Sequence, residues 1–311
     1  MSCVLSPGRG FTLKALVLAA DGLELATIPE PTRETPDAVL VEVTLISLNR
    51  GETSLPWRSG QVAGWDAFGT VIETSSDGQG PPVGSTVTTW GYSGAWAQQR
   101  VVSRHDLAVV AGNIDPYAAA ALPAAGVSAL HAVKTAQIVK GTRLAIVGGT
   151  GGVGHLATQL AASLGAIVTV VTRDPISASA AHTKSANWNI NFTSVEDINP
   201  SAEFDAIIDT VGGTPLSLLT EHLARRGRVL LVGAAGGEKT TLDTSQLIKR
   251  KASMHSLDVP TPLGNDLSDL LTLVSEEKIR LTASDGGSWV RLIDEPASQL
   301  MGMGKSVFHV N

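Results

Sequence analysis

The sequence predicts an α/β protein in which a doubly wound parallel sheet is joined to a mostly β domain. Three observations predict this class. Short strand-like runs fill the first 115 residues, strands and helices alternate over about 116–259, and a glycine-rich turn directly follows an apolar run in that second region. With 311 residues, the chain is longer than a single hydrophobic core usually supports, which favours two domains.

The first 115 residues contain short strands separated by turn residues. The strand-like runs are "KALVLAA", "AVLVEVTLISL", "FGTVIET", "GSTVTTW" and "AWAQQRVV", and clusters such as "SSDGQGPP" separate them. Apolar and β-branched runs bounded by Gly, Pro, Ser and Asp are typical of strands and turns. We therefore predict a mostly β domain over residues 1–115.

The pattern changes at "DPYAAAALPAAGVSALHAVKTA", an alanine-rich helix that we expect Pro123 and Gly126 to interrupt. The strands predicted after it are 143–147, 167–171, 190–192, 206–209 and 228–233. Helices are predicted between most of them, including one in "PLSLLTEHLARRG". Strands that alternate with helices at this spacing favour a parallel sheet. This domain is predicted to span 116–259, and the β domain to resume over 260–311 with a helix in "LSDLLTLVSEEKI" and a strand in "KSVFHV".

Composition and charge exclude several classes of function. The net charge is -6, and no run of like charge is longer than "KRK" at 249–251, so we expect neither nucleic acid nor an anionic membrane as a partner. Cys3 is the only cysteine, which leaves no intrachain disulfide and no zinc lobe built from four cysteines. The apolar residues 15–20 are too few for a signal-peptide core or a membrane span. We expect a cytoplasmic protein.

The most informative motif is "RLAIVGGTGGVGH", where glycines stand in G-x-G-x-x-G register after a strand-like run. In such a turn Gly149 permits a tight bend, Gly151 lets backbone N–H groups approach a pyrophosphate, and Gly154 allows close packing of helix on strand. The helix that follows has one apolar face, and Gly165 is expected to end it. The residues expected to contact a dinucleotide here are Gly149, Thr150, Gly151, Gly152, Val153 and Gly154. The alternative is a glycine-rich turn that binds nothing.

The residues after the second strand of this domain bear on which dinucleotide binds. An acidic residue about 20 positions after the first motif glycine holds the ribose of NAD, whereas this chain has Thr172 near that position. Asp174 precedes Pro175, so a helix N-cap explains it locally, with a ribose ligand as the alternative. Arg173 is left to face the adenosine ribose, where it would bond to a 2′-phosphate. This predicts NADPH as the cofactor, and the alternative for Arg173 is a solvated surface arginine.

The segments "LPAAGVSALHAV", "VGGTGGVGHLATQLAASLGA", "FDAIIDTVGG", "RGRVLLVGAAGG" and "SLNRGE" together resemble a known family. They are similar to the zinc-independent quinone oxidoreductase and enoyl reductase branch of the medium-chain dehydrogenase/reductase superfamily, from about residue 13 to "GKSVFHV". The resemblance implies a split GroES-like catalytic domain, a Rossmann domain, and a nicotinamide site in the cleft between them. It also implies hydride transfer from NADPH to a quinone or to the β-carbon of an α,β-unsaturated carbonyl, often by a homodimer.

The same resemblance bears on zinc. Zinc-dependent relatives have a Gly-His-Glu motif where this chain has Gly64, Trp65 and Asp66, a cysteine near Asn49, and another near Ala125. A catalytic zinc needs three protein ligands, which Asp66 alone does not supply. We therefore expect a metal-free reaction, with Asp66 making a structural bond in the domain core.

The family pattern also implies roles for single residues. It places Asn49 beside the nicotinamide ribose or the substrate carbonyl, Ser128 as a hydroxyl that contacts the cofactor, and Phe192 against the adenine. The respective alternatives are an Asx-turn residue, a helix cap and a core phenylalanine. Backbone contacts with the cofactor are expected after the later strands, at Val211, Gly233, Ala234 and Leu257.

The proton donor is not fixed by the pattern. Enoyl reductases of the polyketide type have a tyrosine directly after the asparagine, where this chain has Arg50. Tyr92, in "WGYSGAW", is therefore a candidate donor, and bulk water is the alternative. Tryptophans in the first 100 residues either wall a hydrophobic cleft for a flat substrate or fill the β core: Trp57, Trp65, Trp90 and Trp96.

We expect an NADPH-dependent, metal-free reductase of a small hydrophobic quinone or α,β-unsaturated carbonyl compound. Two alternatives stay open at this point. One is a biosynthetic enzyme on the same scaffold, either a specific enoyl reductase or a cyclase. The other is a protein that binds NADPH without catalysis, because a fold and a cofactor site do not fix the chemistry.

Overall fold

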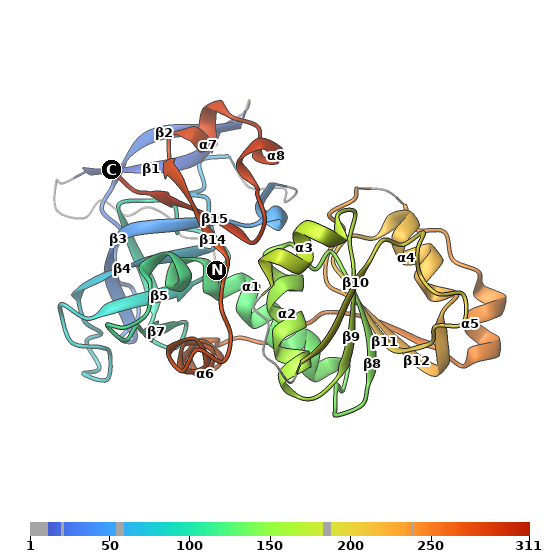
Figure 1. Ribbon diagram of the computed structural model, residues 1–311. Coiled ribbons are helices and arrows are strands. Elements are labelled where there is room, and N and C mark those ends of the chain that lie inside the picture. Colours follow the sequence, from blue (N-terminus) through green and yellow to red (C-terminus); the bar gives the residue numbers. More distant parts are fainter. Residues whose placement is uncertain (1–11, 20–21, 54–58, 183–187, 238) are drawn as a thin grey trace. The chain divides into compact units, whose positions relative to one another are not determined.

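The computed structural model describes residues 12–19, 22–53, 59–182, 188–237 and 239–311. Contacts divide the chain into two units, shown in Figure 1. Unit 1 consists of residues 1–124, 260–276 and 283–311, and unit 2 of residues 125–259 and 277–282. The division differs from the boundaries expected from the sequence in two segments, because residues 116–124 contact unit 1 and residues 277–282 contact unit 2.

Unit 2 is built on a six-stranded parallel sheet. Its strands are, in spatial order, β10(Asn189–Thr193), β9(Ile167–Val171), β8(Arg143–Val147), β11(Phe204–Asp209), β12(Leu223–Leu231) and β13(Ser253–Ser256). In chain order this arrangement reads 3-2-1-4-5-6, so the direction of winding reverses between β8 and β11. That is the strand order of a doubly wound dinucleotide-binding domain, and the predicted fold class is confirmed.

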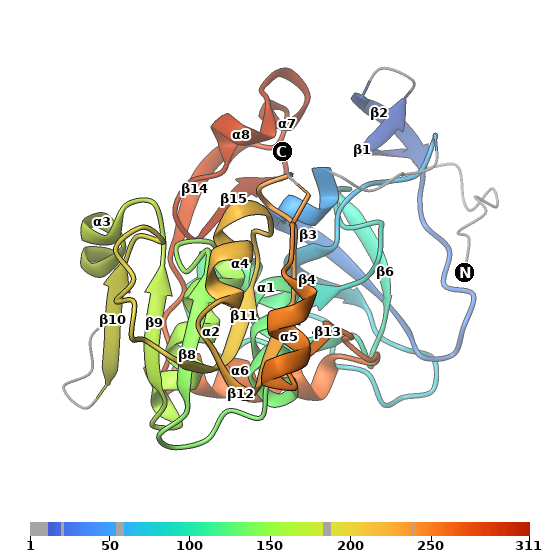
Figure 2. The ribbon, with the colours of Figure 1, turned by 90° about the vertical axis from the view of Figure 1, so that its right-hand side faces the viewer.

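Helices cover both faces of this sheet. Figures 1 and 2 show α2(Gly152–Ser163) and α3(Pro175–Ala181) on one face, and α4(Gly213–Thr220) and α5(Thr244–Arg250) on the other. Because both faces are covered, the central strands are apolar on both sides, and Ile146 and Ile208 have no exposed surface. The sheet therefore forms the core of unit 2.

One predicted helix in unit 2 is wrong over its second half. The helix expected in "PLSLLTEHLARRG" ends at Thr220, and the strand expected at 228 begins at Leu223. The reason is that Leu223 pairs with Phe204 of β11 and is fully buried, after which the pairing register shifts. Arg226, with φ +63°, marks the irregular position within the strand. Burial of Leu223 against β11 outweighs the helical propensity of the segment.

Unit 1 contains a seven-stranded sheet and a separate hairpin. The path through the sheet is β14(Ala283–Ser288), β15(Lys305–His309), β3(Ala38–Leu48), β4(Asp66–Glu73), β5(Thr86–Trp90) and β7(Leu107–Val109), and β6(Gln99–Ser103) also pairs with β3. The hairpin is formed by β1(Thr12–Ala19) and β2(Gly22–Pro29). Short helices complete the unit: η1(Arg50–Thr53), α6(Gly264–Ser275), α7(Arg291–Asp294) and α8(Ala297–Leu300). The predicted mostly β character is confirmed.

The strand near the C-terminus, β15, lies between β14 and β3 in this sheet. β15 pairs antiparallel with β3, with Ser306 opposite Leu48. Trp289 and Phe308 have no exposed surface and lie in the same hydrophobic cluster as Ile46 of β3. Burial of these large side chains explains why the last strand packs against a strand more than 250 positions earlier. The pairing brings Lys305 beside the end of β3.

The helix α1(Pro116–Thr135) is continuous, so the interruption expected at Pro123 and Gly126 is wrong. A proline inside a helix leaves the carbonyl four positions earlier without its N–H donor. Here that carbonyl belongs to Ala119, and the hydroxyl of Thr88 donates to it at 2.7 Å. A side chain of the neighbouring sheet therefore replaces the hydrogen bond that Pro123 removes.

Candidate functional site

Apart from Ser128, the residues predicted to bind the cofactor lie along one edge of the unit 2 sheet. Thr172 and Arg173 follow β9, and Phe192 lies near the end of β10. The other predicted segments follow the remaining strands: 149–154 after β8, Val211 after β11, Gly233 and Ala234 after β12, and Leu257 after β13. All six strands are parallel, so their carboxyl ends share an edge. Ligands of doubly wound sheets bind at this edge, near the reversal between β8 and β11.

The glycine turn differs in one detail from the prediction. The tight bend is made at Gly148, whose φ is +82°, and not at Gly149. Gly149 is needed for a different reason, because a Cβ there would lie 2.2 Å from Cγ1 of Val170 in β9. A Cβ on Gly154 would lie 2.4 Å from the carbonyl oxygen of Gly148, which agrees with its predicted role in close packing. A Cβ on Gly151 would meet only that same oxygen, at 3.5 Å. Gly151 is therefore the position with open space.

Helix α2 begins at this open position without a side-chain cap. Its N-cap residue is Gly151, and no acidic residue lies in its first turn. The backbone N–H groups of a first helical turn have no partner within the helix, and the helix dipole favours an anion there. At the other end Gly165 has φ +83° and terminates the helix as expected. The turn and the helix start therefore suit a diphosphate group.

Two neighbouring residues after β9, Arg173 and Asp174, lie in different environments. Asp174 is the N-cap of α3, and its Oδ1 accepts a hydrogen bond of 3.0 Å from the backbone N of Ser177. The hydrogen bonds from Ser177 also lower the pKa of Asp174. The cap interpretation of Asp174 is confirmed. Arg173 is exposed and forms neither a hydrogen bond nor an ion pair with any residue that the structure describes.

Two histidines that the sequence analysis did not select support the glycine turn. Nε2 of His182 lies 2.9 Å from the carbonyl oxygen of Gly149, and because a carbonyl only accepts, Nε2 donates. Nδ1 of His155 lies 3.4 Å from the same Nε2. Burial lowers the pKa of His182, and burial with the nearby His182 lowers the pKa of His155 to about 4. Both rings are therefore neutral at pH 7. Phe192 is half-buried, and its ring centroid lies 5.1 Å from that of His182.

The turn after β11 is held by a buried carboxylate. Asp209 has no exposed surface, and its side chain accepts hydrogen bonds from the backbone N atoms of Val211 and Gly212 at 2.9–3.2 Å. Burial raises the pKa of Asp209, and these backbone bonds oppose that effect. The carbonyl of Val211 in turn accepts from the N–H of Gly236, so the segments after β11 and β12 are tied together. Sequence reasoning identified this segment but not Asp209.

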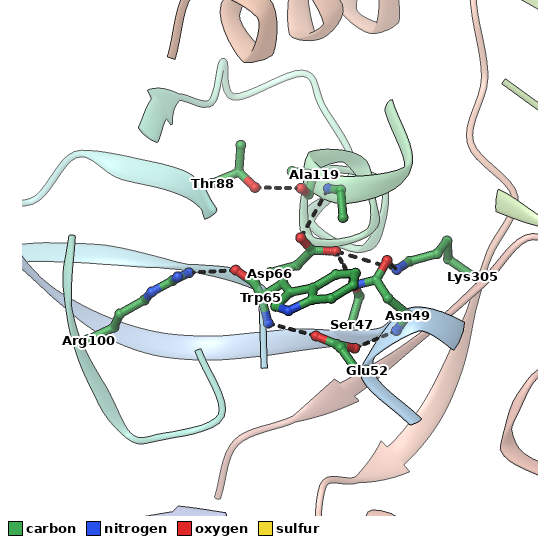
Figure 3. A network of polar contacts seen from close by, with 10 residues as sticks. Ser47, Asn49, Glu52, Trp65, Asp66, Thr88, Arg100, Ala119 and Lys305 are labelled. Carbon is green, nitrogen blue, oxygen red and sulfur yellow. Dashed lines mark hydrogen bonds and ion pairs between the residues drawn. The ribbon is translucent and has the colours of Figure 1, made fainter. Parts of the chain in front are cut away.

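Unit 1 contains a buried polar network centred on Asp66 (Figure 3). Oδ2 of Asp66 accepts from Oγ of Ser47 at 2.9 Å and from Nδ2 of Asn49 at 2.8 Å. Oδ1 accepts from the backbone N of Ala124 at 3.0 Å. Nζ of Lys305 lies 3.4 Å from Oδ2 of Asp66 and donates to Oδ1 of Asn49. The expected structural role of Asp66 is therefore confirmed, whereas the Asx-turn alternative for Asn49 is wrong because Lys305, not a local backbone N–H, occupies its Oδ1.

Glu52 forms the second acidic group of this network (Figure 3). It is buried in η1, where its carboxyl oxygens accept from the backbone N atoms of Asn49 and Trp65, each at 2.6 Å. Burial, reinforced by the charge of Asp66, raises the pKa of Glu52 to about 8. Glu52 is therefore mostly protonated at neutral pH. Arg100, also buried, donates to the carbonyl of Trp65 at 2.9 Å.

The remaining predicted residues occupy varied environments. Ser128 lies in the middle of α1, so the helix-cap alternative is wrong for it. Tyr92 is 70% exposed, and its ring centroid lies 4.7 Å from that of Trp90. Trp96 is buried in the core of unit 1, Trp65 and Trp90 are half-buried, and Trp57 lies outside the described residues. The tryptophans therefore do not share one environment.

Two searches of the described part of the chain bear on the class of protein. Within it, no three His, Cys, Asp or Glu side chains are grouped so that they could hold a metal ion. None of the helices described is both long and apolar enough to cross a membrane. The Gly64–Asp66 segment offers one carboxylate, and both of its oxygens are already hydrogen-bonded.

Comparisons with known proteins agree with this architecture. Residues 152–276 match the family described as zinc-binding dehydrogenase. The chloroplast envelope quinone oxidoreductase homolog of Arabidopsis thaliana is 25% identical over 287 residues, which cover 84% of this chain and 85% of that protein. Alcohol dehydrogenase 1 of Caenorhabditis elegans is 26% identical over 214 residues, which cover 66% of this chain and only 59% of that protein.

Solved structures share the whole fold at low identity. The quinone oxidoreductase from Coxiella burnetii has a TM-score of 0.78 and 24% identity, covering 97% of this chain and all of that one. A mycobacterial protein complexed with NADPH has a TM-score of 0.82 and 19% identity, covering 96% of this chain and all of that one. At these identities the likeness establishes the fold and leaves the chemistry to the residues of the site.

Proposed function

We propose that this chain, a member of the medium-chain dehydrogenase/reductase superfamily, is an NADPH-dependent and zinc-independent oxidoreductase. Its proposed reaction is hydride transfer to a quinone or to the β-carbon of an α,β-unsaturated carbonyl. The similarity to a quinone oxidoreductase homolog and to an alcohol dehydrogenase supports nicotinamide-dependent oxidoreduction as the broader class. The choice of NADPH rests on Arg173, the absence of zinc on Asp66, and the type of acceptor on Asn49.

The choice of NADPH rests on the different environments of two neighbouring residues that follow β9, Arg173 and Asp174. Asp174 is the N-cap of α3, where its Oδ1 accepts from the backbone N and its Oδ2 from the hydroxyl of Ser177, so its carboxylate already has a structural role. Arg173 beside it is exposed and has no partner among the described residues, so its guanidinium is available to a 2′-phosphate. A hydrogen bond to a charged group contributes about 1.5–3 kcal/mol, or roughly ten- to a hundred-fold in affinity.

The residues of the chain have distinct parts in the proposed reaction. A bound nicotinamide supplies the hydride. The first turn of α2 would bind the pyrophosphate, and Arg173 the 2′-phosphate. Asn49 would donate a hydrogen bond to the substrate oxygen, where negative charge develops as hydride arrives at carbon. Tyr92 is proposed to give the proton that completes the reduction.

The proposal that zinc takes no part rests on the donor set at Gly64, Trp65 and Asp66. Trp65 offers no ligand atom for zinc, and the oxygens of Asp66 are bound to Ser47, Asn49 and Ala124. We expect purified protein that has been dialysed against a chelator to keep its rate of quinone reduction. Loss of that rate, restored by added zinc, would contradict the proposal.

The test of the cofactor proposal is Arg173→Ala, with Arg225→Ala as the matched control. Arg225 is an exposed arginine of the same unit, but it lies in the amino-terminal half of β12, away from the carboxyl edge of the sheet. We expect Arg173→Ala to weaken NADPH binding about 10- to 100-fold and NADH binding less than 3-fold, measured by titration calorimetry. The control should change neither. Equal affinity of the unaltered protein for NADH and NADPH would refute the assignment.

A further inference from the structure

The side-chain amide of Asn49 contacts two charged groups of opposite sign, Lys305 and Asp66, which lie 3.4 Å from each other. Nζ of Lys305 donates to its Oδ1, and its Nδ2 donates to Oδ2 of Asp66 at 2.8 Å. An ammonium group can only donate and an ionised carboxylate can only accept, so the chemistry itself assigns which end of the amide is oxygen. A flipped amide would set NH₂ against the ammonium and oxygen against the carboxylate. The orientation of Asn49 is therefore fixed by its two charged neighbours.

Burial and further bonds make this arrangement rigid. The exposed fractions are 8% for Asn49, 0% for Asp66 and 7% for Lys305. Ser47 and the backbone of Ala124 also bind the carboxylate, so Asp66 has little freedom to turn. The backbone of Asn49 is held as well, since its N–H donates to Glu52 at 2.6 Å. In such a low-dielectric site these bonds are stronger than they would be in water.

The arrangement leaves one N–H of the Asn49 side chain for a ligand. Its oxygen accepts from Lys305, and one of the two Nδ2 hydrogens is directed to Asp66. The second Nδ2 hydrogen has no acceptor among the residues that the structure describes. Asn49 can therefore offer a ligand a free N–H donor, while the ammonium group of Lys305 already takes one of the two acceptor positions of Oδ1.

We propose that Lys305 is a positioning residue that, with Asp66, holds the amide of Asn49 as a donor toward an acceptor oxygen of the substrate. The inference rests on the proposed function for the location of the substrate, and it narrows the substrate to compounds with a carbonyl or quinone oxygen at the reacting end. The hydrogen bond strengthens as that oxygen gains negative charge during reduction. The ammonium group of Lys305, which donates to Oδ1, draws electron density toward that oxygen and makes the N–H groups of the amide better donors.

The kinetic test is a double-mutant cycle between Lys305→Met and Asn49→Ala, assayed with NADPH and 1,4-benzoquinone. We expect Lys305→Met alone to lower kcat/KM roughly 10- to 100-fold, and Lys305→Arg, which keeps a donor, to restore most of it. In the Asn49→Ala background the same lysine substitution should change kcat/KM less than 3-fold. Lys305 acts through Asn49 only if the effects are non-additive, so additive losses would overturn the inference.

A second test does not depend on turnover. In protein labelled with ¹⁵N at asparagine, the Asn49 side-chain NH₂ pair is identified by its loss in Asn49→Ala. We expect one sharp pair in the unaltered protein, broadening or doubling in Lys305→Met as the amide samples two orientations, and a single pair again in Lys305→Arg. An unchanged sharp pair in Lys305→Met would overturn the inference. A protein with the expected spectra but no activity toward quinones or enones would instead refute the proposed function.

Controls separate positioning from general loss of structure. Lys14→Met removes an exposed lysine of unit 1 whose Nζ is bound to the hydroxyl of Thr27, and it should leave both the kinetics and the spectrum unchanged. Because Lys305→Met leaves Asp66 without its cation, that variant is at risk of unfolding. The charge-balanced double variant Lys305→Met/Asp66→Asn serves in its place. It removes both charged neighbours of Asn49, so broadening or doubling of the NH₂ pair is expected and an unchanged pair again overturns the inference.

Discussion

Alanine substitutions at Gly154 and Gly151, two glycines of the same turn, are predicted to affect different properties of the protein. In Gly154→Ala the new Cβ would lie 2.4 Å from the carbonyl oxygen of Gly148 and 2.9 Å from Cα of Gly149. In Gly151→Ala the new Cβ would have one neighbour, at 3.5 Å, and the φ of −79° suits alanine. We therefore expect the first change to destabilise the fold and the second to disturb only what binds there.

The magnitudes follow from these distances. Contacts of a Cβ below 3.0 Å essentially do not occur, so Gly154→Ala must open the turn by at least 0.6 Å. The new Cβ would meet backbone atoms. Two hydrogen bonds hold these atoms in place, one from the N–H of Gly151 to the carbonyl of Gly148 and one from Nε2 of His182 to the carbonyl of Gly149. Overpacking of this kind costs about 1–3 kcal/mol, which is roughly 3–10 °C in Tm. Gly151→Ala should leave Tm unchanged or slightly raised, because alanine has less freedom in the unfolded chain.

The assay combines thermal unfolding of the cofactor-free protein with calorimetric titration of NADPH. For Gly151→Ala we expect an unchanged Tm and at least a roughly 10-fold rise in Kd, about 1.4 kcal/mol, because the methyl group would occupy the path of the pyrophosphate to the backbone N–H groups. For Gly154→Ala we expect a lower Tm before any ligand is added. An unchanged Kd in Gly151→Ala would refute the pyrophosphate assignment, and an unchanged Tm in Gly154→Ala would refute the packing argument.

Three further predictions concern single carboxylate and phenol groups. The pKa of Glu52 is about 8 in the folded protein against 4.5 as the ordinary value, so its stabilising contribution is complete below about pH 4.5 and lost as pH rises through 8. Between pH 5.5 and 9, the free energy of unfolding measured with urea should therefore fall by about 3 kcal/mol more in the unaltered protein than in Glu52→Gln. If the free energies of the two proteins change with pH in parallel, the shifted pKa of Glu52 is disproved. Asp174→Ala should lower Tm by a few degrees through loss of the α3 cap, while calorimetry finds the NADPH-to-NADH affinity ratio within 2-fold of the original. Tyr92→Phe should lower kcat for an enone about 100-fold if its hydroxyl gives the proton, and an unchanged kcat would assign that proton to water.

The sequence allowed most of the architecture of unit 2 to be predicted, because the signals of five of its strands are local, whereas β13 and α5 were not predicted. A strand such as 143–147 shows itself by a continuous apolar run, and the turn after it by glycine spacing. The cap of α3 could be predicted because Asp174 and Pro175 are neighbours in the chain. The strand start at Leu223 could not, since it depends on pairing with Phe204 across the sheet.

The polar network of unit 1, in contrast, joins residues that are distant in the sequence. Asn49 was identified through its neighbours in the chain. Glu52 gave no comparable signal, and Lys305 showed only as the first residue of the strand-like run "KSVFHV". Similarly, the continuity of α1 through Pro123 depends on the hydroxyl of Thr88, a residue of another strand. Such relations need three-dimensional proximity, which spacing along the chain does not encode.

Most strands of unit 2, the position of the glycine turn and the cap at Asp174 could be predicted from the sequence alone, because propensity, periodicity and capping act over a few residues. Only the tertiary structure decided that Gly148 makes the bend, that His182 holds the carbonyl of Gly149, and that β15 brings Lys305 to Asn49. Each of those contacts joins segments distant in the chain, and it forms because burial of apolar side chains draws the strands together and leaves the enclosed polar groups to pair with one another.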